Sequence, residues 1–76
     1  MRILIVEDDL EAAEVMDRGL TEAGHECVRA ADGEEGLRAA QAGEFDVMIV
    51  DRMMPRMDGV TMVQALRREA DQTPVL

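Results

Sequence analysis

The chain has 76 residues, enough for one small domain, and 47% of them are hydrophobic, which excludes a disordered composition. Its formal net charge of −9 argues against nucleic acid as a partner of this segment, because phosphate backbones select basic surfaces. We find no apolar run long enough to span a membrane and no secretory signal, and Cys27 is the single cysteine. We therefore expect a cytoplasmic location with no membrane partner.

The chain begins with a predicted strand followed by a predicted helix. Residues 2–6 are a continuous apolar run, typical of a strand buried on both faces of a parallel sheet. Helical periodicity follows, with Asp8 or Asp9 as the N-cap and Gly24 suited to a left-handed turn at the end. The residues that recur on the expected apolar stripe are Leu10, Ala13, Met16, Leu20 and Ala23.

Two further strands flank a second predicted helix. Residues 26–30 read as a short strand. Asp32, with Glu35 three residues later, forms a capping-box pattern that predicts a helix running to about Ala42. Residues 46–50 are again apolar after the first position and predict a third strand.

The last third of the chain predicts a loop, a helix and the start of a strand. Residues 51–57 are expected to form a loop, because Pro55 disfavours helix before it. A third helix should open at residues 58–59 and place Val60, Val63 and Leu66 on one face. Residues 75–76 look like the first step of a fourth strand. This alternation predicts right-handed crossovers and a parallel sheet with helices on both faces.

Acidic residues follow two of the predicted strands. Glu7, Asp8 and Asp9 follow the first strand, and Asp51 directly follows the third. Ligands of open α/β sheets bind beyond the carboxyl ends of the strands, so these carboxylates should meet if the two strands are neighbours. Their repulsion would favour a divalent cation with oxygen ligands, and Mg²⁺ fits best. An acidic helix N-terminus is the alternative for the first cluster, but it does not explain Asp51.

A carboxylate beside magnesium can also act as a nucleophile and form an aspartyl phosphate. In that reading Asp51 attacks the phosphoryl group, and Asp8 and Glu7 hold the metal. Phosphoryl transfer depends mainly on positioning and charge neutralisation, which such a site supplies. The chain contains no serine and only one cysteine and one histidine, so few other nucleophiles compete.

Three stretches of the chain resemble the receiver domains of two-component response regulators. They are residues 3–9, 31–37 and 45–59, and the D-x-M-M-P-x-M-D-G pattern that starts at Asp51 is the most specific part. The resemblance covers the whole chain, in order and without insertions. It is strongest to the subfamily that joins a receiver to a winged-helix DNA-binding output domain.

The resemblance implies a role for each matching residue. Asp51 matches the phospho-acceptor, and Glu7 and Asp8 match the acidic pair that positions Mg²⁺. Met53 matches the position whose backbone carbonyl binds the metal. The positions that shape the loop are Pro55 and Gly59. The implied donor is a phosphohistidine on a histidine kinase, and the implied role is a signalling switch rather than an enzyme.

The resemblance also implies a flavodoxin-like, doubly wound parallel sheet of strand order 2-1-3-4-5 with five helices. Residues 1–76 match one partial receiver domain, from the first strand to the start of the fourth, without the fourth helix, fifth strand and fifth helix. The family's Ser or Thr after the fourth strand and its Lys after the fifth have no match, since Thr73 precedes that strand and the chain has no lysine.

Three functions remain open on these grounds. The first is the phosphoryl-accepting switch. The second is a receiver that is not phosphorylated and serves only as an interaction or oligomerisation module, and an open strand edge with a bare apolar face leads us to expect a homo-oligomer. The third is a metal-dependent phosphatase of another α/β family, which would place D-x-D after the first strand, where this chain has Glu7-Asp8-Asp9.

Overall fold

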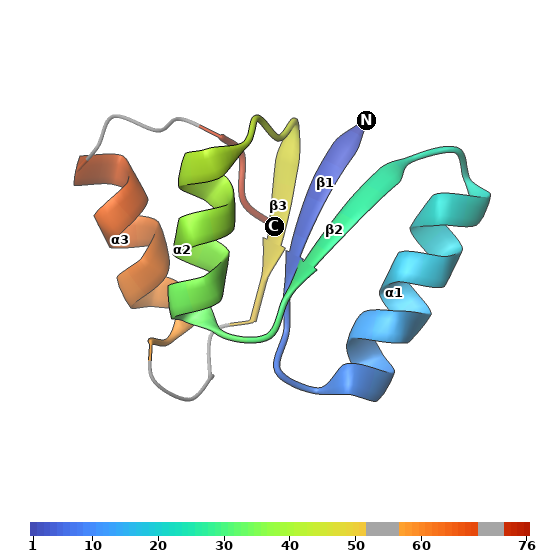
Figure 1. The fold of residues 1–76 in the computed structure, drawn as a ribbon, viewed down its shortest axis with the longest axis horizontal. Coiled ribbons are helices and arrows are strands. Elements are labelled where there is room, and N and C mark those ends of the chain that lie inside the picture. The colour runs from blue at the N-terminus through green and yellow to red at the C-terminus, as the bar shows by residue number, and fades with distance from the viewer. Residues whose placement is uncertain (52–56, 69–72) are drawn as a thin grey trace.

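The computed structural model describes residues 1–51, 57–68 and 73–76. The described part alternates strands and helices along the chain (Figure 1). The elements are β1 (Arg2–Val6), α1 (Leu10–Glu22), β2 (Glu26–Ala30), α2 (Gly33–Ala42), β3 (Val47–Val50) and α3 (Gly59–Arg68). The predicted elements are confirmed, except that Asp46 lies just before β3, where its carboxylate accepts a 2.7 Å hydrogen bond from the Arg2 N–H.

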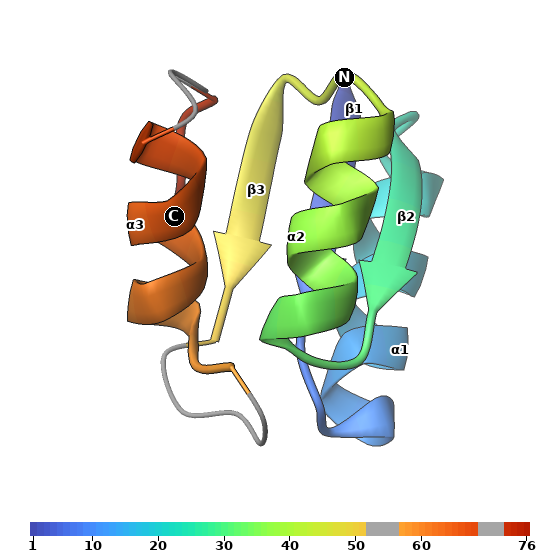
Figure 2. The same ribbon diagram turned by 60° about the vertical axis from the view of Figure 1, so that its left-hand side comes forward.

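The three strands form a parallel sheet of order β2-β1-β3. Ile5 of β1 is paired with Arg29 on one side and Ile49 on the other, so all three strands point the same way. Helix α1 lies on one face of the sheet, and α2 and α3 lie together on the other (Figures 1 and 2). The expected doubly wound, flavodoxin-like arrangement is therefore confirmed for this part of the domain.

A fourth chain segment joins the sheet beside β3. Val75 forms a parallel bridge to Met48. The Met48 N–H donates to the Pro74 carbonyl at 2.8 Å, and the Leu76 N–H donates to the Met48 carbonyl at 2.8 Å. The expected start of a fourth strand is thus in its predicted place, as a single bridge.

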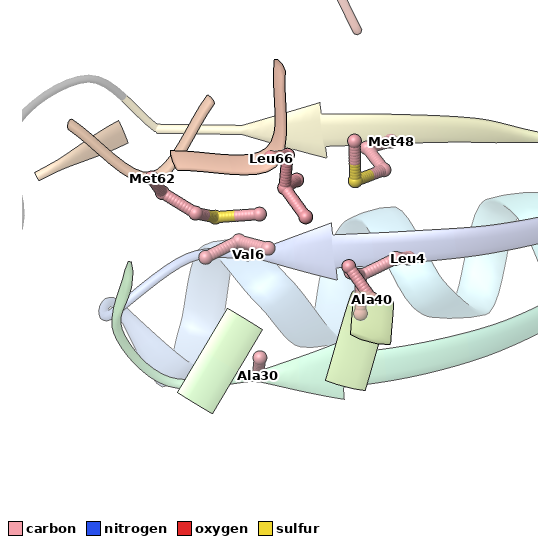
Figure 3. Close-up of a cluster of buried hydrophobic side chains, with 7 residues drawn as sticks. All are labelled: Leu4, Val6, Ala30, Ala40, Met48, Met62 and Leu66. Carbon is pink, nitrogen blue, oxygen red and sulfur yellow. The ribbon is translucent and has the colours of Figure 1, made fainter. Parts of the chain in front are cut away.

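The main apolar core lies between the sheet and the pair α2 and α3. Its buried members are Leu4, Val6, Ala30, Ala40, Met48, Met62 and Leu66 (Figure 3). Ile3 and Ile5 are also buried, and the alternation of a strand directs them to the α1 face. Burying each large apolar side chain contributes about 1.5–3 kcal/mol, so this packing holds β1 and β3 in place against α2 and α3.

Side-chain caps set the helix boundaries. The Asp9 carboxylate accepts hydrogen bonds from the backbone N–H groups of Glu11 and Ala12, so Asp9 is the N-cap of α1. Asp32 caps α2 in the same way, and Gly24 has the left-handed φ of 97° expected after α1. These local predictions are confirmed.

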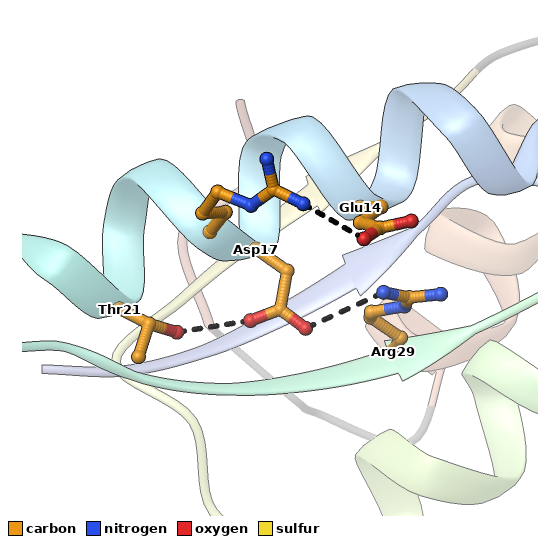
Figure 4. Close-up of polar contacts among 5 residues, drawn as sticks. Glu14, Asp17, Thr21 and Arg29 are labelled. Carbon is orange, nitrogen blue, oxygen red and sulfur yellow. Dashed lines mark hydrogen bonds and ion pairs between the residues drawn. The ribbon is translucent and has the colours of Figure 1, made fainter.

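Polar contacts fasten α1 to β2. The Asp17 carboxylate lies 3.6 Å from the Arg29 guanidinium of β2 and accepts a 2.9 Å hydrogen bond from the Thr21 hydroxyl (Figure 4). A second ion pair, between Glu14 and Arg18, lies on the exposed surface of α1 and joins two residues of the same helix. Such half-exposed pairs are worth at most about 1 kcal/mol, so they orient α1 more than they stabilise it.

Three apolar positions of the predicted helix stripes were predicted wrongly. Ala23 is exposed, because it lies at the C-cap of α1, past the last helical residue. Leu10 is 69% exposed, because it opens α1 beyond the carboxyl end of the sheet and has no strand beneath it. Val60 is 46% exposed, because α3 turns Met62 and Leu66 into the core instead. Val60 borders an open apolar groove next to the segment 75–76.

Candidate functional site

The sheet register brings the carboxyl ends of β1 and β3 together. Val6 is paired with Val50, and the Asp51 N–H donates to the Val6 carbonyl at 2.9 Å. The residues that follow these strands are therefore neighbours. One carboxylate oxygen each from Glu7, Asp8 and Asp51 lies within 4.8 Å of the other two. Within residues 1–51, 57–68 and 73–76, no other three acidic, histidine or cysteine side chains gather this closely.

The three acidic residues after β1 have two different roles: Glu7 and Asp8 lie in the cluster with Asp51, and Asp9 caps α1. Glu7 and Asp51 are half-buried and Asp8 is exposed, so the cluster opens to solvent on one side. Asp9 does not join it, because its carboxylate is the N-cap of α1. The Asp9 N–H instead donates to the Glu7 carboxylate at 3.2 Å, which orients Glu7 at the site.

The environment of Glu7 disfavours its charged form. Burial raises the pKa of Glu7 above its ordinary value of 4.5, and the neighbouring Asp51 and Asp8 carboxyl groups raise it further. The hydrogen bond from the Asp9 N–H opposes this rise. A cation held by the three carboxylates would remove the electrostatic cost, and an all-oxygen donor set of this kind suits a hard ion such as Mg²⁺.

The raised pKa of Glu7 should make the free energy of unfolding depend on pH. Because native Glu7 holds its proton more tightly than unfolded Glu7, its contribution to stability is present at acid pH and is lost as the pH rises through the raised pKa. We expect the wild type to lose more stability than Glu7→Gln as the pH rises from 4.5 to neutrality without metal, and Mg²⁺ to offset the loss. Urea unfolding of both proteins over this range tests it. Parallel pH curves for the two proteins would contradict it.

Gly59 lets α3 begin directly against the backbone of Asp51. A Cβ atom added at Gly59 would overlap the Asp51 carbonyl oxygen and would lie 2.8 Å from a Val50 methyl group. The predicted shaping role of Gly59 thus has a physical basis at this contact. Met53 and Pro55, the other predicted residues of this loop, lie outside the described residues.

Sequence reasoning missed the contact made by Gly33. An added Cβ there would overlap the carbonyl oxygen of Met57, which lies close behind Asp51 in the chain. The Asp-Gly pair at residues 32–33 signals a helix start, and nothing local in the sequence indicates which distant backbone the glycine touches.

The described helices include none that is long and apolar enough to cross a membrane.

Comparison with known proteins agrees with this geometry. The family model of the response regulator receiver domain matches residues 3–76. The chain is 47% identical over 76 residues to the transcriptional activator protein IrlR of Burkholderia pseudomallei, covering 100% of this chain and 33% of that protein. It is 40% identical over 76 residues to the transcriptional regulatory protein TcrA of Mycobacterium tuberculosis, covering 100% of this chain and 30% of that protein. The chain thus spans about a third of the length of these relatives.

Solved structures show the same fold. The receiver domain of the Francisella response regulator 1452 superposes with a TM-score of 0.94 at 32% identity, covering 97% of this chain and 61% of that one. The response regulator TrrA of Thermotoga maritima, in complex with Mg²⁺ and BeF, gives a TM-score of 0.91 at 31% identity, covering 97% of this chain and 64% of that one. The family match, the fold and the acidic cluster agree, and this chain belongs to the response regulator receiver domain family.

Proposed function

We propose that residues 1–76 act, as part of one receiver domain, as a phosphoryl-accepting switch in which Asp51 takes a phosphoryl group from a phosphohistidine of a histidine kinase. One observation carries the proposal: the Asp51 carboxylate, at the end of β3, lies within 4.8 Å of the Glu7 and Asp8 carboxylates. A carboxylate in that setting suits phosphoryl transfer better than general acid–base chemistry. We infer a role as signalling acceptor and not as an enzyme, and a part in transcriptional regulation, as in its relatives.

The site residues fit a bound Mg²⁺. Glu7, Asp8 and Asp51 would hold it through carboxylate oxygens, and the resemblance adds the backbone carbonyl of Met53. When bound, Mg²⁺ supplies positive charge that offsets the negative charge of the phosphoryl oxygens. TrrA, which is bound to Mg²⁺ and BeF, supports this choice of ion by its similarity to the chain.

The chain's own part in transfer is to hold one carboxylate in place. A carboxylate oxygen of Asp51 attacks the phosphorus of the phosphohistidine in line, a P–O bond forms, and the P–N bond breaks with its electron pair returning to the imidazole. The Asp51 backbone is fixed on one side by its hydrogen bond to Val6 and on the other by its contact with Gly59. This rigidity reduces the entropy lost on reaching the reactive geometry.

Beryllofluoride, a mimic of the phosphoryl group, tests the proposed function. The wild-type chain with Mg²⁺ should give a bound ¹⁹F resonance in NMR, and the resonance should vanish when Mg²⁺ is chelated. A chain that is folded but gives no bound resonance would favour the rival interaction module. A wild-type chain that hydrolyses small phosphate esters with turnover would favour the rival phosphatase.

We further propose that copies of this chain associate with one another. An open groove of about 460 Å³ lies between α3 and the segment 75–76 and is lined mainly by apolar side chains, including Val50, Val63 and the 78% exposed Leu76. An exposed apolar surface beside a strand edge favours pairing with a second copy. Sedimentation velocity should show dimers or larger species that dissociate in Val63→Asp. A monomer at high concentration would contradict this proposal and leave the acceptor role intact.

The proposed kinase donor also bears on where in the cell this chain resides. A cytoplasmic kinase as donor requires this chain in the same compartment, and a chain with only one cysteine, Cys27, has no need of an oxidising environment. We therefore propose a cytoplasmic location.

A further inference from the structure

Asp9 makes hydrogen bonds in two directions, toward α1 and toward the acidic cluster. Its carboxylate accepts from the backbone N–H groups of Glu11 at 3.0 Å and Ala12 at 3.3 Å. Its own backbone N–H donates to the Glu7 carboxylate at 3.2 Å. In Figure 1 the chain passes directly from the end of β1 into the first turn of α1. A single residue therefore joins that first turn to one of the clustered carboxylates.

The helix cap fixes the backbone of Asp9. The residue has a φ of −78° and a ψ of 109°, the extended conformation that an N-cap adopts. Its carbonyl accepts a 2.9 Å hydrogen bond from the Ala13 N–H, the first such bond along α1. Together with the two bonds to the carboxylate, this bond holds residue 9 at a fixed angle to the helix. The Asp9 N–H therefore keeps its direction toward Glu7.

The Glu7 side chain benefits from such a fixed donor. Its carboxylate lies within 4.8 Å of those of Asp8 and Asp51, and like charges at this distance repel. Glu7 is half-buried, and fixing its long side chain for an ion costs conformational entropy. A hydrogen bond that already holds the carboxylate in place reduces this cost when the ion binds.

We propose that the Asp9 carboxylate is a positioning group for Mg²⁺ binding: by capping α1 it fixes the N–H that orients Glu7, and it does not itself bind the ion. The inference rests on the proposed function, in which Glu7 is one of the metal ligands. The path from α1 to the site consists of three hydrogen bonds and the backbone of one residue.

The coupling between the cap and the metal site is reciprocal. If opening of the Asp9 cap weakens Mg²⁺ binding by a given factor, bound Mg²⁺ must disfavour that opening by the same factor. The first turn of α1 should therefore open less often when the site holds Mg²⁺. A cap that serves only the stability of α1 would show neither effect.

The test compares substitutions at residue 9 that change the charge equally. Asp9→Ala and Asp9→Asn each remove one negative charge, but only asparagine keeps a side-chain oxygen that can cap α1. Asp9→Ala should bind Mg²⁺ about threefold or more weakly than Asp9→Asn, because its first turn opens more often. Asp9→Ser, which restores a capping oxygen, should bind like Asp9→Asn. Calorimetric titration at a temperature where circular dichroism shows each variant folded measures the affinities.

Val15→Gly is the control for helix stability alone. Val15 is 67% exposed on α1, and glycine there lowers helix propensity while leaving the cap and every charge in place. This variant should bind Mg²⁺ like the wild type. Equal affinities in Asp9→Ala and Asp9→Asn, or the same loss in Val15→Gly as in Asp9→Ala, would overturn the inference alone. A wild type that binds neither Mg²⁺ nor beryllofluoride would overturn the proposed function, and this inference with it.

Amide hydrogen exchange in the wild-type protein provides a measurement that needs no variant. Mg²⁺ should slow the exchange of the Glu11 and Ala12 amides, which donate to Asp9. The matched control is the Glu35 amide, which donates at 2.8 Å to Asp32, the cap of α2. Exchange at Glu11 and Ala12 that saturating Mg²⁺ leaves unchanged, or slows no more than at Glu35, would overturn the inference.

Discussion

Asp51→Asn is expected to abolish the gain of one phosphoryl group that the wild type shows with Mg²⁺ and acetyl phosphate. Asparagine has nearly the same shape and keeps the backbone hydrogen bond to Val6, so the fold should be retained. Its amide oxygen is a poor nucleophile and carries no charge, so no aspartyl phosphate can form. Intact-mass spectrometry over a time course measures the result, and the expected loss is complete.

A matched control distinguishes the loss of the Asp51 carboxylate from the loss of any one negative charge. Asp46→Asn removes one exposed carboxylate at the opposite end of β3 and should leave the mass gain unchanged. If Asp51→Asn gains the phosphoryl group at the wild-type rate, another residue accepts it. If both variants lose it, the effect is one of folding or net charge, and the acceptor assignment fails.

Asp8→Asn is expected to weaken Mg²⁺ binding by about tenfold or more while making the metal-free protein more stable. The three carboxylates lie within 4.8 Å of one another, so removing one charge relieves repulsion in the absence of metal. The same change removes a charged oxygen ligand from the site. The two effects have opposite signs, and no simple loss of folding produces that combination.

Thermal unfolding with and without Mg²⁺ measures both effects of Asp8→Asn. Asp9→Asn is the matched control, because it removes one charge from the adjacent residue and leaves a good N-cap for α1. It should keep the wild-type rise in unfolding temperature on addition of Mg²⁺. An equal loss of that rise in both variants would contradict the assignment of Asp8, and not Asp9, to the site.

Much of the fold was predictable, because local patterns and the core agree. The apolar run at residues 2–6 predicted β1. The capping residues, Asp8 or Asp9 for α1 and Asp32 for α2, predicted where the helices begin, and the structure selects Asp9. The meeting of Glu7 and Asp51 followed from one rule on parallel sheets, once β1 and β3 were taken as neighbours.

The features that the sequence predicted wrongly or did not predict depend on tertiary packing. Leu10 fits a helical stripe, but periodicity does not show that the sheet ends before it. The spacing of α3 fits a stripe through Val60 as well as one through Met62, and only packing against the core decides between them. The contact of Gly33 with Met57 joins residues that no local pattern relates.

Paramagnetic relaxation by Mn²⁺, used in place of Mg²⁺, tests the shared cation site most directly. We expect substoichiometric Mn²⁺ to broaden the backbone amide signals of Glu7, Asp8 and Asp51 together, while those of Asp46 and Glu26 at the other end of the sheet stay sharp. Broadening that follows exposed acids throughout the protein, or that spares Asp51 while affecting Asp8, would contradict it.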